Sequence, residues 1–158
     1  MRWDLIERFE ILRKGDLAAA VKSFSGTEDF FSEHFPGNPL VPDPLFVEMI
    51  AQAGGVLFGL GLDFKKEVIL AKIMDAHFFH AVRPPCCLLI EARIDDAREE
   101  GAWISGVVTC QGRIVAEASV LLVVIESLEE NKKKIVFNEA FLKHFDIYNI
   151  AGAAGGKN

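Results

Sequence analysis

An apolar run over residues 44–62 constrains the fold of this chain more than any other feature. A segment of this length could cross a membrane as a helix. Glu48 and Gln52 lie near its middle, however, where an ionised carboxylate would cost several kcal/mol in lipid. Four glycines between positions 54 and 61 weaken a lone helix, and no basic cluster flanks either end. We therefore predict a helix buried by protein on all sides and no membrane span.

A proline-rich loop leads into this helix. Residues 33–44 read Glu-His-Phe-Pro-Gly-Asn-Pro-Leu-Val-Pro-Asp-Pro, with Pro at four of the twelve positions. Each Pro fixes its own φ at about −65° and biases the preceding residue toward extended geometry, so the loop loses little entropy when it becomes ordered. The loop carries one candidate general base, His34, and the carboxylate of Glu48 follows fourteen positions later (48 − 34).

The segments around this helix are short and rich in β-forming residues. Residues 17–24 predict a strand or an edge hairpin partner. Five further strands are predicted after the helix, at residues 68–74, 76–82, 88–95, 102–110 and 114–125. Gln111-Gly112-Arg113 separates the last two as a hairpin turn. Partial polar alternation indicates an antiparallel sheet with one covered face, so we predict an α+β domain in which strands wrap one buried helix.

The bulk composition excludes several classes of function. The chain is 51% hydrophobic with 13 Phe, and surplus apolar surface of this kind often ends in a subunit interface or an acyl pocket. A net charge of −6 disfavours binding to a phosphate backbone, so we expect no nucleic-acid partner. The first residues show no basic region followed by an apolar run, which predicts no signal peptide and a cytoplasmic location.

The cysteines and histidines do not form a recognisable metal site. Three cysteines without a C-x-x-C spacing predict neither a disulfide framework nor a zinc site, and we expect reduced thiols. His77 and His80 lie three apart in the predicted strand 76–82, so they should point to opposite faces. His144 lies near the C-terminus and suggests no function.

We predict one folded domain over residues 1–127 and a separate tail over residues 128–158. The tail begins with a charged run at 128–134 that predicts a solvated linker. A short amphipathic stretch at 138–145 follows, and residues 152–158 are predicted to be disordered.

The residues from His34 to Gln52 resemble the 3-hydroxyacyl-acyl-carrier-protein dehydratases of the FabZ and FabA type. The family pattern is His-Phe-Pro-Gly-x-Pro, two apolar residues, Pro-Gly, and a carboxylate fourteen positions after the His; residues 34–42 with Glu48 meet that spacing. Residues 76–84 show a weaker similarity to a second family segment. The resemblance covers about residues 5–125 and implies the hot-dog fold, a curved antiparallel sheet wrapped around one long apolar helix.

The resemblance also implies a reaction. Family members dehydrate 3-hydroxyacyl thioesters on acyl carrier protein to trans-2-enoyl thioesters, in fatty-acid or related polyketide-like biosynthesis. By that mechanism His34 is the base for the Cα proton and Glu48 is the acid for the departing hydroxyl, with no cofactor and no metal. Glu rather than Asp at position 48 favours the FabZ type. Members form homodimers or trimers of dimers, and the His and carboxylate of one site come from different subunits.

The sequence around the pair predicts how it is supported. Glu48 has apolar neighbours on both sides, which predicts a buried carboxyl that stays protonated as a general acid must. Gln52 is at i+4 and could hold this carboxyl in place. The expected substrate-binding residues are Phe35, Pro36, Gly37, Pro42, Asp43, Leu45 and Gln52.

One departure from the family pattern is Asp43-Pro44, which stands where the family has Gly and an apolar residue. Main-chain N–H groups polarise the thioester carbonyl there in the family, and Pro44 has none. We predict Asp43 as the N-cap of the helix and Pro44 as its first residue, with the Asp43 carboxylate on the N–H of Leu45 or Phe46. A weakened oxyanion site follows from this arrangement.

Two alternatives remain open on the same fold. The chain could be a non-catalytic acyl-binding protein or a partner subunit of a hot-dog hetero-oligomer, for which Asp43-Pro44 is the supporting feature. It could also be an acyl thioesterase, because a fold alone does not determine the reaction.

Overall fold

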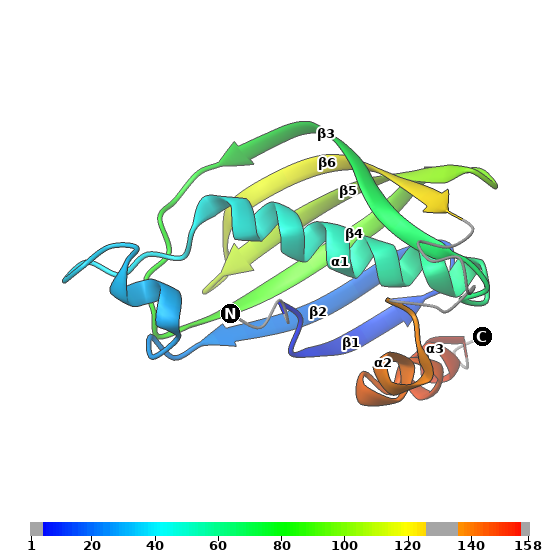
Figure 1. Ribbon diagram of the computed structural model, residues 1–158, viewed down its shortest axis with the longest axis horizontal. Helices are drawn as coiled ribbons and strands as arrows, with labels where there is room; N and C mark the ends of the chain where they lie inside the picture. Colours follow the sequence, from blue (N-terminus) through cyan, green and yellow to red (C-terminus); the bar gives the residue numbers. More distant parts are fainter. Residues whose placement is uncertain (1–4, 126–135, 156–158) are drawn as a thin grey trace.

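The computed structural model of the chain describes residues 5–125 and 136–155. Strands β1 (Arg8–Arg13) and β2 (Leu17–Phe24) come first, followed by the short 3₁₀ helix η1 (Asp29–Ser32) and the long helix α1 (Asp43–Gly61). Four strands then follow, and two short helices complete the order: β3 (Glu67–Phe78), β4 (Cys86–Ala97), β5 (Gly101–Cys110), β6 (Arg113–Ile125), α2 (Glu139–His144) and α3 (Ile147–Gly155) (Figure 1).

The six strands form one antiparallel sheet in the order β1-β2-β4-β5-β6-β3. The sheet curves around α1, which crosses its concave face (Figure 1). This is the predicted hot-dog arrangement of the α+β class, so the expected fold is confirmed. The turn at Gln111-Gly112 has positive φ at both residues (51° and 76°), as a tight hairpin between β5 and β6 requires.

Helix α1 is the centre of the hydrophobic core. It is long and apolar enough to cross a membrane, yet 72% of its most apolar window is buried inside the protein. Two glycines explain how closely the sheet approaches it: a Cβ on Gly54 would lie 2.7 Å from Ile104 Cγ2, and a Cβ on Gly106 would clash with Ile50. The predicted burial of the helix is therefore confirmed, and glycines that weaken a lone helix allow this one to pack against β5.

The prediction of two separate strands at 68–74 and 76–82 is wrong, because the structure has one strand there. Strand β3 runs without interruption from Glu67 to Phe78, and two register shifts, at Leu70/Lys72 and Ile73/Asp75, absorb the polar interruption as bulges. His80 lies beyond the end of β3, so the argument that placed it on the opposite face from His77 does not apply.

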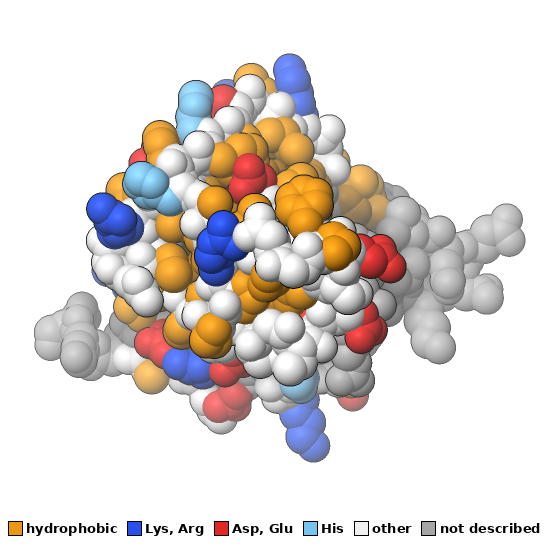
Figure 2. Space-filling model, turned by 90° about the vertical axis from the view of Figure 1, so that its left-hand side faces the viewer, with side chains coloured by type: hydrophobic (Ala, Val, Ile, Leu, Met, Phe, Trp, Pro, Cys, Tyr) orange, Lys and Arg blue, Asp and Glu red, His pale blue; other side chains and the backbone are white. Residues whose placement is uncertain are grey.

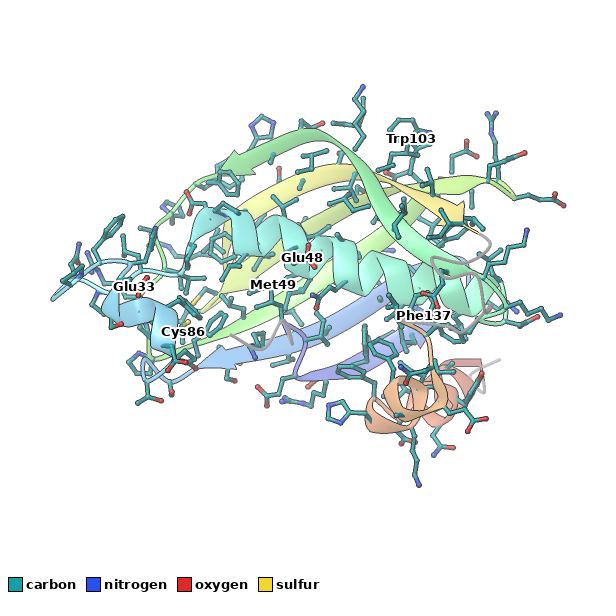
Figure 3. All side chains as sticks on the ribbon, in the orientation of Figure 1. Glu33, Glu48, Met49, Cys86, Trp103 and Phe137 are labelled. Carbon is teal, nitrogen blue, oxygen red and sulfur yellow. The ribbon has the colours of Figure 1, made fainter. Side chains whose placement is uncertain are left out.

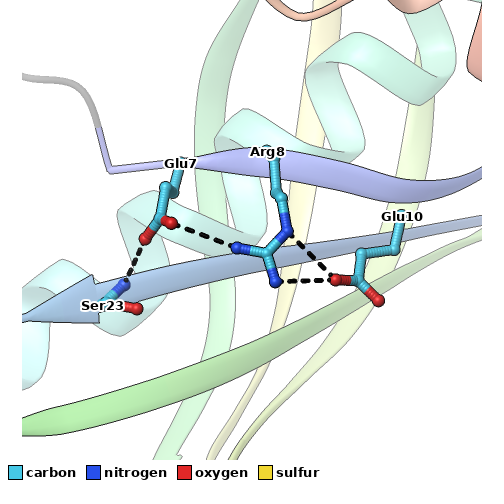
Figure 4. Close-up of polar contacts among 4 residues, drawn as sticks. All are labelled: Glu7, Arg8, Glu10 and Ser23. Carbon is cyan, nitrogen blue, oxygen red and sulfur yellow. Dashed lines mark hydrogen bonds and ion pairs between the residues drawn. The ribbon is translucent and has the colours of Figure 1, made fainter.

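The N-terminal hairpin forms the sheet edge opposite β3. The predicted strand 17–24 is confirmed as β2, which pairs with both β1 and β4. A register shift between Phe9 and Ile11 breaks the side-chain alternation of β1, which explains its weak sequence pattern. On the surface of this hairpin, Glu7 accepts the Ser23 N–H at 3.0 Å, and Arg8 bridges the carboxylates of Glu7 and Glu10 at 3.1 and 2.9 Å (Figure 4).

The C-terminal helices pack on the domain. The predicted linker 128–134 lies outside the described residues. Helix α2 begins at the N-cap Asn138, whose side chain accepts the Phe141 N–H at 2.9 Å. Helix α3 contacts β1 and continues to Gly155, where disorder was predicted from residue 152. The buried side chain of Ile147, 0% exposed, shows why this segment is ordered.

Candidate active site

The His34 loop is docked by aromatic side chains and fixed by backbone hydrogen bonds. Phe31 in η1 is buried and packs on Phe24 with ring centroids 5.8 Å apart. Beyond it, the His34 N–H donates to the Phe30 carbonyl at 2.9 Å and the Leu40 N–H donates to the His34 carbonyl at 3.0 Å. The chain reverses at Gly37, whose φ of 71° favours glycine.

The imidazole of His34 has a defined orientation. Its Nδ1 lies 3.2 Å from the carbonyl oxygen of Leu40, and a carbonyl can only accept a hydrogen bond. Nδ1 therefore carries the proton in the neutral ring, which leaves the Nε2 lone pair free to accept another. The ring also stacks on Phe35 with centroids 4.1 Å apart. A neutral, half-buried imidazole held this way is suited to act as a general base.

His34 lines a pocket of about 390 Å³ at the N-terminal end of α1. Phe35 and Asp43, both predicted to bind substrate, line it too, as does His80, which the sequence did not single out. The other predicted loop residues, Pro36, Gly37 and Pro42, do not line this pocket but shape its loop, and Leu45 is buried. The face of the molecule at this end carries hydrophobic side chains interspersed with histidines and charged groups (Figure 2).

The start of α1 differs from the prediction. Pro42, extended at φ −61° and ψ 128°, is the N-cap, so Asp43 and Pro44 are the first two helical residues. No side chain caps the helix, and the Leu45 N–H donates instead to the Pro42 carbonyl at 3.0 Å. The predicted Asp43 cap is therefore wrong, because the preceding proline already provides the extended residue that a cap requires. The exposed Asp43 carboxylate lies in the first turn, at the positive end of the helix dipole.

Glu48 lies on α1, in the middle of the molecule (Figure 3). Its Oε1 accepts a hydrogen bond from Gln52 Nε2 at 2.9 Å, which confirms the predicted i+4 contact. The expected full burial is corrected: Glu48 is half-buried because it lines a pocket of about 590 Å³. The other α1 residues of this pocket are Ala51, Gln52, Gly55 and Val56, and its remaining walls come from β1, β3, β6 and the C-terminal segment.

The two predicted catalytic residues lie in separate pockets of the single chain. None of the described residues lines both the His34 pocket and the Glu48 pocket. Figure 3 shows the separation, since Glu33, the neighbour of His34, lies at the far end of the loop and Glu48 lies along the helix. One chain therefore presents a base and a carboxylate at two different places.

Sequence reasoning missed the contribution of the C-terminal segment. His144 lines the Glu48 pocket together with Phe137, Phe141 and Phe145. The three phenylalanines are spaced four apart (137, 141, 145), and that spacing was the available signal, although Phe137 lies just before the N-cap Asn138 of α2. We predict a separate tail here because the residues just before this segment, 128–134, form a charged run.

The other ionisable side chains in the described part of the chain form neither a metal site nor a reactive thiol. In residues 5–125 and 136–155 no group of His, Cys, Asp and Glu is arranged to hold a metal ion. Burial, with a smaller effect of Cys110, raises the pKa of Cys86 to about 11, and burial also raises the pKa of Cys110. Both thiols are therefore protonated and weakly nucleophilic at neutral pH.

Residues 4–119 match the model of the FabA-like domain. A curated relative from Hydrogenobaculum sp., named 3-hydroxyacyl-[acyl-carrier-protein] dehydratase FabZ, is 34% identical over 132 residues, which are 82% of this chain and 88% of that protein. A FabZ of Caldicellulosiruptor saccharolyticus is 34% identical over 118 residues, covering 70% of this chain and 84% of that protein.

Solved structures share the fold at lower identity. The conserved protein PA5202 from Pseudomonas aeruginosa superposes with a TM-score of 0.64 at 12% identity, over 79% of this chain and 94% of that one. Smu.793 from Streptococcus mutans, bound to acetyl CoA, gives a TM-score of 0.59 at 15% identity, over 75% and 87% of the two chains. These likenesses support the fold alone.

Proposed function

This chain belongs to the FabA-like family of 3-hydroxyacyl-acyl-carrier-protein dehydratases, and we propose on that premise that His34 and Glu48 are its catalytic base and acid. The chain dehydrates 3-hydroxyacyl thioesters on acyl carrier protein to trans-2-enoyl thioesters in fatty-acid biosynthesis. The reaction takes place in the cytoplasm and uses the side chains of the protein alone.

In this mechanism each group moves one proton. His34 Nε2 removes a proton from Cα of the thioester, and the electron pair forms the Cα–Cβ double bond as the Cβ–O bond breaks. The Glu48 carboxyl donates its proton to the departing hydroxyl, which leaves as water. His34 then loses its proton and Glu48 regains one through solvent, so the enzyme returns to its starting state.

The observation that carries the assignment is the hydrogen bond between His34 Nδ1 and the Leu40 carbonyl at 3.2 Å. It fixes the tautomer that a base needs and turns Nε2 away from the loop backbone. The Gln52 amide orients the Glu48 carboxyl by donating a hydrogen bond to Oε1. In the proposed mechanism Oε2 is therefore the atom that carries the transferable proton.

We place the complete active site between two copies of the chain, as a homodimer or a trimer of dimers. Since His34 and Glu48 line different pockets of one chain, a second copy must bring its own Glu48 to the His34 loop. Strand β3 lies at a sheet edge and exposes Ile73 and Met74, 49% and 45% accessible, as an apolar surface for such a copy.

The test is dehydration of a 3-hydroxyacyl-acyl-carrier-protein thioester, followed by enoyl absorbance. His34→Ala and Glu48→Gln should each lower turnover by about 10²–10⁴-fold, the usual contribution of a general acid or base. Glu139→Gln is the control, because Glu139 is exposed in the first turn of α2, lines neither pocket and lies away from β3 in the sequence. Mixing the two inactive variants should restore turnover, since a mixed dimer contains one site with both native residues.

Retained turnover in either variant would remove that residue from the mechanism, and no recovery on mixing would contradict the shared site. A second candidate, a non-catalytic partner subunit, is favoured by one observation: the Asp43 carboxylate lines the pocket of the base, and Pro44 offers no N–H beside it. Acyl binding without turnover by the wild type would support that candidate. Release of free acid without enoyl product would instead indicate a thioesterase.

A further inference from the structure

The pocket beside Glu48 has a wall that lies outside the family match. The match ends at residue 119, whereas Val136, Phe137, Phe141, His144 and Phe145 all line the pocket. Apart from Glu48, Gln52 and His144, the lining residues are apolar. The carboxylate therefore opens onto an apolar cavity that this chain completes with residues of its own.

The wall is held in place by specific contacts. The Val136 N–H donates to Glu67 Oε2 at 3.2 Å, and Glu67 is 1% exposed. Phe137 packs on Phe64 with ring centroids 5.1 Å apart, and a Cβ on Gly59 would lie only 2.9 Å from its ring. The segment is thus seated against both α1 and the start of β3.

The far end of the wall is also anchored. Phe141 packs against Phe145 with centroids 4.9 Å apart and ring planes inclined at 59°, and Phe145 meets Phe9 of β1 edge-on at 5.6 Å. Aromatic contacts of this kind add to the burial energy of each ring. A wall fixed at both ends can set the shape of the cavity.

We propose that this C-terminal wall, residues 136–145, closes the site for the distal acyl chain of the substrate and limits the enzyme to medium chain lengths. The proposal rests on the proposed function, which places the reacting carbons at Glu48. An unbranched saturated chain is the occupant whose chemistry fits, because the cavity is apolar beyond the Glu48–Gln52 pair and begins at that pair.

The length of the cavity gives the expected limit. Its α1 residues run from Glu48 to Val56, eight residues (56 − 48) or about 12 Å along the helix axis. A saturated chain advances about 1.25 Å per bond, from bonds of about 1.5 Å and angles of about 111°. The cavity therefore holds roughly ten carbon–carbon bonds beyond Glu48. A 3-hydroxydodecanoyl chain fits this length and a 3-hydroxyhexadecanoyl chain exceeds it.

Gly55 allows the cavity to be shortened without disturbing the core. It lines the cavity, and a Cβ at this position meets no atom within 4 Å. Side chains on a helix lean toward its N-terminus, so Gly55→Leu fills the space next to Gln52. The matched control is Gly61→Leu, on the same helix, with equally free space and outside the cavity.

The experiment measures kcat/KM for butyryl, dodecanoyl and hexadecanoyl 3-hydroxy substrates on acyl carrier protein. Wild type should favour dodecanoyl over hexadecanoyl. Gly55→Leu should lose roughly tenfold or more on dodecanoyl relative to its loss on butyryl, the scale of discrimination set by unaccommodated methylenes. Phe141→Ala, which opens the wall, should raise activity on hexadecanoyl, and Gly61→Leu should behave as wild type.

An unchanged or uniformly lowered profile for Gly55→Leu would overturn the proposal while leaving the dehydratase assignment intact. If the wild-type protein turns over none of the substrates, the proposed function fails. The proposal for the acyl pocket is then tested by acyl binding alone. Calorimetry with the dodecanoyl thioester of N-acetylcysteamine then supports the pocket if Gly55→Leu weakens binding and Gly61→Leu does not. Equal binding by both variants would refute it.

Discussion

The two pockets beside α1 are built in different ways. The His34 pocket consists of residues between His34 and Ala81, all inside the family match, and its loop is fixed by prolines and main-chain hydrogen bonds. The Glu48 pocket takes one of its walls from a segment beyond that match, and this wall is held mainly by aromatic rings. The pocket that His34 lines lies inside the family match, whereas one wall of the Glu48 pocket lies beyond it.

This contrast suggests how one fold serves substrates of different size. A general base must be positioned to within a fraction of an ångström, and the proposed base His34 has its ring oriented by a main-chain carbonyl. An acyl chain is recognised by the volume that it fills, and a wall of packed side chains can change that volume with little effect on the reacting groups.

The largest expected effect compares one buried phenylalanine from each region. Phe31 and Phe137 are 4% and 3% exposed, so Phe31→Ala and Phe137→Ala should each lower the free energy of unfolding by about 3–5 kcal/mol. Urea unfolding measures both losses. Their catalytic effects should differ: Phe31→Ala loosens the His34 loop and lowers turnover for every chain length, whereas Phe137→Ala changes the chain-length preference.

Identical chain-length profiles for these two variants would remove the functional distinction between the regions. Val136→Ala is the control for the wall, because that side chain is 38% exposed and its loss should barely change stability.

The next effect concerns the departure at the start of α1. Asp43→Gly with Pro44→Val removes a carboxylate from the His34 pocket and restores a main-chain N–H in the first turn. One oxyanion donor is typically worth about 10²–10³ in rate, so turnover should rise by up to about that factor. Dehydration of a 3-hydroxyacyl-acyl-carrier-protein thioester, followed by enoyl absorbance, measures this change in turnover. Asp43→Asn alone separates the effect of charge from that of the missing N–H, and unchanged turnover in both would show that the oxyanion site lies elsewhere.

The smallest effect is a pH dependence at the loop end. Burial acts to raise the pKa of Glu28, but hydrogen bonds from the Ser25 and Gly26 N–H groups, at 2.9 and 2.8 Å, outweigh it and lower that pKa. Because the pKa of Glu28 in the folded protein lies below its ordinary value of 4.5, the stabilisation is present above that pH and is lost as the pH falls through the folded pKa.

Glu28→Gln should therefore lower the free energy of unfolding by about 1 kcal/mol or less at neutral pH, and the difference from wild type should vanish in acid. Urea unfolding at both pH values measures it. Glu139→Gln, an exposed carboxylate in the first turn of α2, is the control. A Glu28 difference that persists in acid would mean that the carboxylate charge is not its source.

The sequence was informative where one physical effect dominates. The apolar run can only be a buried helix once Glu48 and Gln52 exclude lipid, and the prolines around His34 leave the loop few conformations. The hairpin at Gln111-Gly112 follows from local chemistry in the same way. These features needed no knowledge of distant contacts.

The parts that were mispredicted depend on distant contacts. Bulges in β3 are set by its pairing with β6, so the sequence predicts two strands, at 68–74 and 76–82, where the structure has one. The C-terminal wall depends on Phe9, Phe64 and a buried Glu67, none of which is near it in sequence. His34 and Glu48 line different pockets of one chain, which their spacing in the sequence does not reveal.

The position of α3 has a consequence for how copies of this protein can associate. Strand β1 bounds one side of the sheet and is in contact with α3, while β3 bounds the other side, and no described element pairs with its outer edge. In a dimer joined through β3, each copy would occupy the free β3 edge of the other, and the remaining edges would be the β1 strands with α3 against them. Such a pairing would be closed at β3, because both copies use the same edge.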